Sequence, residues 1–200
     1  MRSAGRARDA GIDARVLAVA ARHLAGQGYQ AMSLAAVAAE ACTTRQALYR
    51  RWPAKADLAA AAIAQMSDDE TAVPSDDPFG DLVAELSDFQ RGVSRRGRLS
   101  LVGTMLQDTT DPDVRSRYRA QVIEPRRRRI RAILDAAVRL GLADADADLE
   151  IAVTMCTGSW YGRALAGAQV PANWPQRTAA LVWRAIGGPP DVPGPPNVPG

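Results

Sequence analysis

Side chains that could form paired hydrogen bonds with the edges of nucleic-acid bases lie together near residue 45. The guanidinium of Arg45 can bridge O6 and N7 of a guanine, and the amide of Gln46 can bridge N6 and N7 of an adenine. Each such paired contact contributes roughly 1–3 kcal/mol of discrimination between bases. At helical spacing, Leu48 faces inward while Tyr49 and Arg50 stay available to an outside partner. The segment therefore has the residue types of a helix that reads base edges in a DNA groove.

The neighbouring elements must hold that helix in place. Ser33 lies where an N-cap is needed, ahead of apolar residues at helical spacing, and Thr44 is a second N-cap, ahead of the helix at residues 45–52. Cys42 and Thr43 form the turn between the two helices. An earlier helix is predicted over residues 13–27 with Gly28 as its left-handed C-cap, and a fourth helix over residues 55–66.

Helical periodicity continues through the rest of the chain, with no convincing run of alternating residues, so the fold class is all-α. Acidic residues and prolines at 67–78 mark a domain boundary. We expect later helices from Pro78, around residues 99–106, over residues 112–140 with a kink at Pro125, over 149–167 and over 174–186. The apolar residues at 149–167 fall on more than one side, which predicts a helix with two neighbours. The domains are residues 1–66, 67–187 and a disordered Pro-rich tail at 188–200.

Charge is distributed unevenly along the 200 residues. Residues 1–67 carry nine basic and four acidic side chains, whereas residues 68–90 carry eight acidic ones and no lysine or arginine. This arrangement suits a polyanion-binding module joined to a second module, although solvated charged helix faces would give the same count. The run Arg126 to Arg129 with Arg131 is interpreted as such a solvated face, because four consecutive helical residues point in all directions.

Composition favours a soluble protein of the reducing cytoplasm. The longest apolar stretch, residues 151–168, is interrupted by polar residues and falls short of a membrane span of ~20 residues. No apolar signal-peptide core follows the arginines at the N-terminus. Cys42 and Cys156 lie far apart and show no metal-ligand or redox spacing, so we expect two small apolar residues, no disulfide, no metal and no cofactor.

The segment GYQAMSLAAVAAEACTTRQALYRRWPAKADL, residues 28–58, resembles the DNA-binding core of the TetR family of transcriptional regulators. The matching positions are Gly28, Tyr29, Ser33, Val37, Ala38, Ala41, Leu48, Tyr49, Trp52, Lys55 and Leu58. The resemblance implies an N-terminal three-helix helix-turn-helix domain, followed by a C-terminal helical domain for ligand binding and dimerisation. It extends to the C-terminal half only as a general helical layout.

The resemblance also implies roles for individual residues. Tyr49 would lie against the DNA backbone or a thymine methyl group beside Arg45 and Gln46. Phosphate contacts are assigned to the polar residues around this helix, namely Ser33, Thr44, Arg51 and Lys55. Two positions depart from the family pattern. Cys42 stands where glycine usually allows a positive φ, and Ala54 replaces the usual Ser or Asn cap, which should weaken the fourth helix by ~1 kcal/mol.

The C-terminal assignments are more general. Small residues Gly158, Gly162 and Ala166, together with Leu181 on the last helix, are assigned to a dimer interface, with ordinary packing inside the domain as the alternative. An effector site is assigned to residues Phe89, Val102, Met105, Leu106, Trp160, Tyr161 and Arg163. These residues would suit an apolar or aromatic molecule with a polar or anionic group near Arg163, although aromatic residues at helical spacing are more often core.

The function that follows is a homodimeric, ligand-responsive repressor that binds a palindromic operator in the bacterial cytoplasm, at the nucleoid, and leaves it when an effector binds. Catalysis is disfavoured, because the single histidine, His23, lies in the first helix and Asp144, Asp146 and Asp148 are interpreted as helix caps. The main alternative is a helical ligand- or protein-binding module that does not read DNA sequence.

Overall fold

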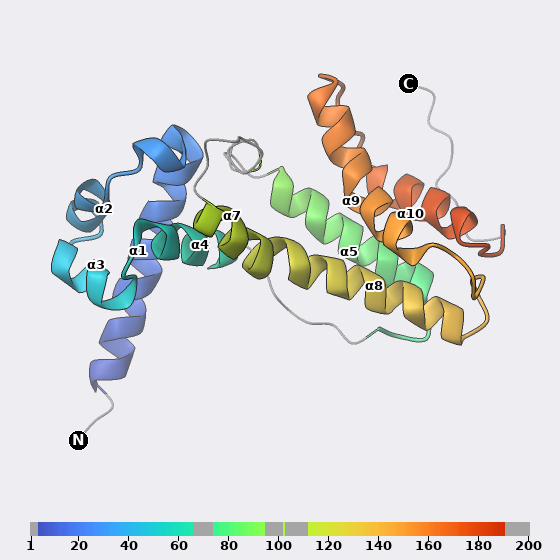
Figure 1. Ribbon diagram of the computed structural model, residues 1–200, viewed down its shortest axis with the longest axis horizontal. Helices are drawn as coiled ribbons and strands as arrows, with labels where there is room; N and C mark the ends of the chain where they lie inside the picture. Colours follow the sequence, from blue (N-terminus) through green and yellow to red (C-terminus); the bar gives the residue numbers. More distant parts are fainter. Residues whose placement is uncertain (1–3, 66–73, 95–101, 103–111, 191–200) are drawn as a thin grey trace. The chain divides into compact units, whose positions relative to one another are not determined.

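The computed structural model describes residues 4–65, 74–94, 102 and 112–190, and within these ranges it contains helices and turns without strands (Figure 1). Two compact units are present. The first unit holds α1 (Ala4–Ala31), α2 (Leu34–Glu40), α3 (Arg45–Arg51) and α4 (Lys55–Gln65), together with α7 (Pro112–Tyr118) and the π-helix η1 (Arg119–Ile123). The second holds most of α5 (Pro78–Val93), with α8 (Glu124–Arg139), α9 (Leu149–Leu165) and α10 (Trp174–Ala185). The all-α prediction is confirmed.

Local sequence signals set the helix ends in the first unit. The Ser33 hydroxyl accepts a hydrogen bond from Ala36 N at 3.4 Å, and the Thr44 hydroxyl accepts one from Ala47 N at 3.1 Å, so both predicted N-caps are confirmed. Gly28 breaks α1 with φ 77° as expected. The predicted start of α1 at residue 13 is wrong, because the helix extends back to Ala4 through a segment rich in alanine and arginine, both strong helix formers.

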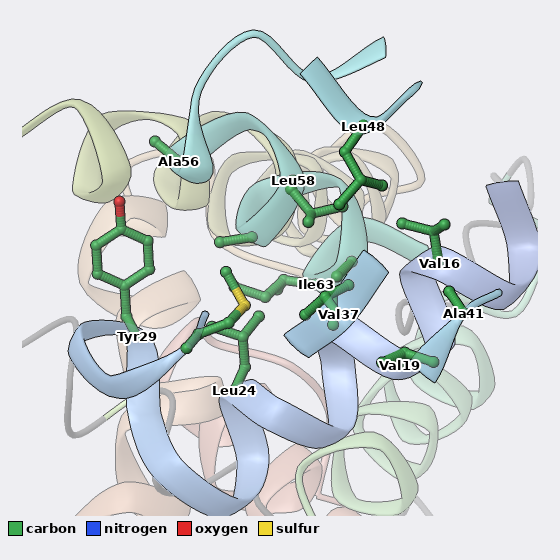
Figure 2. Close-up of a cluster of buried hydrophobic side chains, with 14 of the residues drawn as sticks. Val16, Val19, Leu24, Tyr29, Val37, Ala41, Leu48, Ala56, Leu58 and Ile63 are labelled. Atoms are coloured by element: carbon green, nitrogen blue, oxygen red, sulfur yellow. The ribbon is translucent and has the colours of Figure 1, made fainter. Parts of the chain in front are cut away.

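One apolar cluster holds the first unit together (Figure 2). Val16, Val19 and Leu24 of α1 meet Val37 of α2, Ala41 at the end of that helix, and Leu58 and Ile63 of α4. Figure 2 shows the side chain of Leu48, on α3, directed at Leu58. Because Leu48 is only 2% exposed, it fixes one face of α3 against the rest of the unit.

The long helix predicted over residues 112–140 is divided into α7, η1 and α8. The interruption precedes Pro125, where the backbone N–H of Glu124 donates to the carbonyl of Arg119, five residues back. Pro125 has no N–H and its ring would clash with the carbonyl four residues earlier, so it is accommodated in the first turn of a new helix. Tyr118 is buried in the apolar cluster of the first unit, and Val122 and Ile123 pack against it. This grouping differs from the predicted division along the chain at residues 66 and 67.

In the second unit, Asp77 caps α5, since its Oδ1 accepts from Gly80 N at 3.0 Å, and Leu82, Leu86 and Phe89 are buried. Helix α9 buries one face, formed by Leu149, Ala152, Val153, Cys156 and Trp160. The second apolar face expected to be buried is exposed within this chain, with Ile151 at 57% and Leu165 at 81%. The helix predicted near residues 99–106 and most of the Pro-rich tail lie outside the described residues.

Four helices end in the same C-terminal motif. After α8, α9 and α10 a glycine with positive φ follows the last turn, at Gly141, Gly167 and Gly187. The two backbone N–H groups at and after that glycine donate to carbonyls of the last turn, as in a Schellman motif. Helix α2 ends in the same way, with Cys42 at the glycine position.

Candidate DNA-binding surface

The exposed face of α3 gathers the residues predicted to read bases. Arg45, Gln46, Tyr49 and Arg50 are all exposed, and they form two i, i+4 pairs on one side of the helix. Leu48, on the opposite side, is buried in the core. A helix held on one face, with guanidinium and amide groups near its N-terminus on the other, has the arrangement needed to enter a major groove.

The hydroxyls of Ser33 and Thr44 are used first as helix caps. Each accepts a hydrogen bond from a backbone N–H three residues later, as described above. A capping hydroxyl keeps its own hydrogen for a further acceptor, and both residues are exposed. Their assignment to phosphates therefore remains a prediction that is compatible with their caps.

The side chains of Arg51 and Lys55, which were assigned to DNA phosphates, both have partners within the protein. Arg51 Nε lies 2.6 Å from Asp13 Oδ1 on α1, and the Arg51 side chain is 24% exposed. Lys55 Nζ donates to the carbonyl of Gln30 at 3.0 Å and lies 4.7 Å from the centre of the Tyr29 ring. Burial lowers the pKa of Lys55. Both side chains thus tie the end of α3 and the start of α4 to α1, and their phosphate role remains a prediction.

The two departures from the family pattern have structural consequences. Cys42 has φ 54°, so the turn does require the left-handed conformation that the sequence suggested. Ala54 has no side chain that could cap α4, but its backbone N–H donates to Asp57 Oδ2 at 2.9 Å. The negative charge of Asp57, in the first turn of α4, also interacts favourably with the positive end of the helix dipole. The sequence reasoning missed this compensation, although the acid three residues after the cap position was the signal for it.

Helices α1 and α2 are joined at the surface by Glu40. Its two carboxylate oxygens face Arg22 Nη2 at 2.5 Å and His23 Nε2 at 2.9 Å. Hydrogen bonds from Arg22 and His23 lower the pKa of Glu40. His23 is therefore engaged in holding the helix-turn-helix to α1.

Comparison with known proteins agrees with this geometry. The family description "Tetracyclin repressor-like, C-terminal domain" matches residues 72–182, and "Bacterial regulatory proteins, tetR family" matches residues 16–62. Together they cover most of the chain, and the first alone covers more than half of it. The chain belongs to the TetR family.

Relatives with this fold are distant in sequence. The helix-turn-helix-type transcriptional regulator YdeS of Bacillus subtilis strain 168 is 22% identical over 162 residues, which are 80% of this chain and 82% of YdeS. A TetR transcriptional regulator from Agrobacterium tumefaciens has a TM-score of 0.67 at 20% identity, over 88% of this chain and 92% of that one. The SmeT–triclosan complex has a TM-score of 0.69 at 21% identity, over 94% and 99% of the two chains. This protein is thus a TetR-family, DNA-binding transcriptional regulator with a helix-turn-helix.

In the C-terminal part of this TetR-family regulator, three of the predicted effector-site residues meet. The ring centre of Phe89 lies 6.1 Å from that of Trp160 and 5.6 Å from that of Tyr161. Trp174 completes this aromatic cluster at 5.7 Å from Phe89 and was not anticipated. Arg163 is turned to the carbonyl of Gln169, at 2.9 Å from Nη2, and Val102 is half-buried. Met105 and Leu106 lie outside the described residues.

The arginine run of α8 was expected to be a solvated face, and this is wrong for Arg126 and Arg129, whereas Arg128 and Arg131 are exposed. Arg129 makes two hydrogen bonds to Glu85 of α5, at 3.1 and 3.2 Å, and both side chains are only 11% exposed. Arg126 also faces Glu85 and lies 5.3 Å from the ring centre of Phe89. Arg127 pairs with Glu150 at 2.5 Å. Arg126, Arg127 and Arg129 bind α8 to its neighbours because acids on α5 and α9 lie opposite them, which the run alone could not reveal.

All the residues assigned to the dimer interface, Gly158, Gly162, Ala166 and Leu181, are exposed in this chain. Leu181 of α10 is 57% exposed, and Ile151, Met155 and Leu165 of α9 are also exposed apolar side chains. We refer to these four large residues as the α9–α10 apolar face.

Other kinds of site find no support in the part of the chain that the structure describes. Within it, no group of His, Cys, Asp and Glu side chains is arranged to hold a metal ion. Burial raises the pKa of the Cys156 thiol to about 12, so this thiol stays protonated at neutral pH. None of the described helices is both long enough and apolar enough to cross a membrane.

Proposed function

We propose that this TetR-family protein is a ligand-responsive repressor that binds a palindromic operator as a homodimer and leaves it when a small-molecule effector binds. The observation that carries the proposal is the exposed polar face of α3, where Arg45, Gln46 and Tyr49 stand on one side while Leu48 anchors the other. Arg45 and Gln46 are assigned to base edges, and Tyr49 to the backbone or a thymine methyl group. The protein would act at the bacterial nucleoid.

The α9–α10 apolar face supports the homodimer. Exposed leucine, isoleucine and methionine side chains on two adjacent helices gain free energy when a second copy covers them. Gly158 and Gly162 lie on the exposed side of α9 and would allow close approach of a partner helix. A two-fold dimer would place two α3 helices about one DNA turn, ~34–36 Å, apart, which matches a palindromic operator.

The aromatic cluster supports an aromatic effector. The indole Nε1 of Trp160 is buried and has no hydrogen-bond partner among the residues that the structure describes, and a buried donor of this kind is costly unless something accepts from it. We assign that acceptor to the effector, together with stacking against Phe89 and Tyr161. The triclosan complex of SmeT is a precedent for an aromatic ligand on this fold. Reciprocity then requires that an effector which weakens operator binding is itself bound less tightly by the operator complex.

The test is a fluorescence-anisotropy titration of the protein onto its own upstream intergenic DNA and onto scrambled DNA, at ~150 mM salt. We expect the native DNA to bind at least ~10³-fold more tightly than the scrambled DNA. Arg45→Ala should weaken native binding by about 5- to 150-fold, the equivalent of ~1–3 kcal/mol.

Arg128→Ala is the matched control, because it removes the same charge from an exposed position of α8. It should leave the native-to-scrambled ratio unchanged. Equal, salt-sensitive binding to both DNAs would instead support a helical module that does not read DNA sequence.

A further inference from the structure

The first turn of α4 is joined to its surroundings by two charged side chains. Lys55 reaches back to α1, where it donates to the Gln30 carbonyl. Asp57 pairs with Arg117 of α7 through Oδ1, and its Oδ2 accepts the Ala54 N–H at 2.9 Å. Three helices of the first unit therefore meet at this turn.

We propose that Asp57 is a positioning residue for DNA binding, which acts with Arg117 to fix the start of α4 and, through it, the recognition helix α3. The inference rests on the proposed operator reading. It assigns a role to two residues that lie outside the DNA-contacting face.

Asp57 is suited to this role because each carboxylate oxygen has a separate task. Oδ2 accepts the backbone N–H of Ala54 at the N-terminus of α4, where Ala54 has no side chain that could cap the helix. The other holds Arg117, and the Asp57 side chain is only 16% exposed. Ala54 follows the last residue of α3, Arg51, by three positions, so the peptide that Asp57 holds is the connection between the two helices.

Two further contacts hold α3 within the first unit. Arg51 is paired with Asp13, and Leu48 is packed in the apolar cluster. Because three residues separate the end of α3 from the start of α4, a displacement of the α4 start would change the tilt of α3 and with it the fit of Arg45 and Gln46 to base edges. Fit to base edges changes specific binding, whereas attraction to phosphates is much less sensitive to it.

Arg117 also lies close to the point where the chain leaves the first unit. Tyr118, the next residue, is buried in the apolar cluster of the first unit, and the π-helix η1 then leads directly into α8. Helix α8 carries Arg126, which faces the aromatic cluster. Arg117 therefore links α7 to α4 directly before the chain passes from the first unit to the second.

The simpler role for this ion pair is a small contribution to stability, since pairs with a half-exposed partner contribute little. The two roles predict different results. A merely stabilising pair would change the unfolding midpoint slightly and leave the ratio of native to scrambled DNA affinity unchanged. A positioning pair would lower that ratio.

The experiment measures both affinities for Asp57→Asn, Arg117→Ala and the double variant, with thermal unfolding of each protein followed by circular dichroism. Asparagine keeps an oxygen that can accept the Ala54 N–H but loses the charge. We expect each single variant to lose about three- to tenfold of its affinity for native DNA, with scrambled binding unchanged. The double variant should lose no more than one single variant, because both remove the same contact.

Two further variants complete the test. Arg119→Ala removes the same charge from an exposed position two residues away and should bind as the wild type. Arg117→Lys keeps the charge and should recover most of the lost affinity. The inference is overturned if Arg117→Ala behaves like Arg119→Ala, if the two single losses add in the double variant, or if Arg117→Lys recovers nothing. If those results come while Arg45→Ala still loses operator reading, the proposed function stands; if the wild type itself fails to distinguish the two DNAs, both fail.

Discussion

The two units of this regulator differ in how many large apolar side chains they leave exposed. Among the described residues of the first unit, Tyr49 is the single large hydrophobic side chain that is exposed, and it stands on the face assigned to DNA. The second unit exposes Ile151, Met155, Leu165 and Leu181 on two adjacent helices. Both units consist of amphipathic helices, but only the first buries its apolar residues within one chain. The comparison agrees with the proposal that a second copy of the chain covers the apolar face of the second unit.

Removing a buried leucine from the first unit should have the largest effect on stability. Leu48→Ala leaves a cavity between α3 and the core, and such changes cost about 2–5 kcal/mol. Urea unfolding followed by circular dichroism measures this loss. Leu140→Ala is the matched control, because Leu140 is 50% exposed and lies outside the α9–α10 apolar face, so its truncation should change the unfolding free energy by less than ~0.5 kcal/mol. A similar loss in both variants would contradict the comparison.

Placing a charge on the α9–α10 apolar face should separate the two chains of the dimer. Leu181→Glu would bury an unpaired carboxylate in the proposed interface, which costs ~3 kcal/mol or more and raises the dimer dissociation constant by at least ~100-fold. Light scattering after size exclusion should then give a mass near the 21.3 kDa of one chain. Ala84→Glu adds the same charge at an exposed position of α5 and should leave the dimer intact. A dimeric Leu181→Glu would place the interface elsewhere.

Much of the first unit could be predicted from the sequence because its signals are local. Ser33 and Thr44 cap helices within three residues of their own positions, and Gly28 adopts the positive φ expected at a helix end. The placement of Arg45, Gln46 and Tyr49 on one exposed face follows from the same short-range spacing.

The remaining features depend on contacts between distant residues. The pairs Arg51–Asp13, Arg117–Asp57 and Arg129–Glu85 each join different helices, and no spacing in the sequence identifies one acid among many as the partner. Trp174 joins the aromatic cluster for the same reason, through a turn of the chain. The outer face of α9 was expected to be buried because periodicity shows that a face is apolar without showing whether the cover comes from the same chain.

The smallest effect is expected at the turn of the helix-turn-helix. Four described helices end in the same motif, and the left-handed position holds glycine in three of them and Cys42 in the fourth. A side chain at φ 54° destabilises the folded state by about 1 kcal/mol. Glycine removes this cost, but it loses more backbone entropy on folding than cysteine does, which offsets part of the gain. Cys42→Gly should therefore raise the unfolding free energy by about 0.5 kcal/mol, measured by urea unfolding.

Cys42→Ala separates backbone conformation from loss of the thiol. Alanine keeps the Cβ that the left-handed conformation disfavours, so this variant should show no gain in stability. If alanine stabilises the protein as much as glycine, the cost at this turn comes from the exposed thiol instead of the backbone. The first unit would then be as well adapted at its turn as the second unit is at its three glycines, and the difference between the units would reduce to their apolar surfaces.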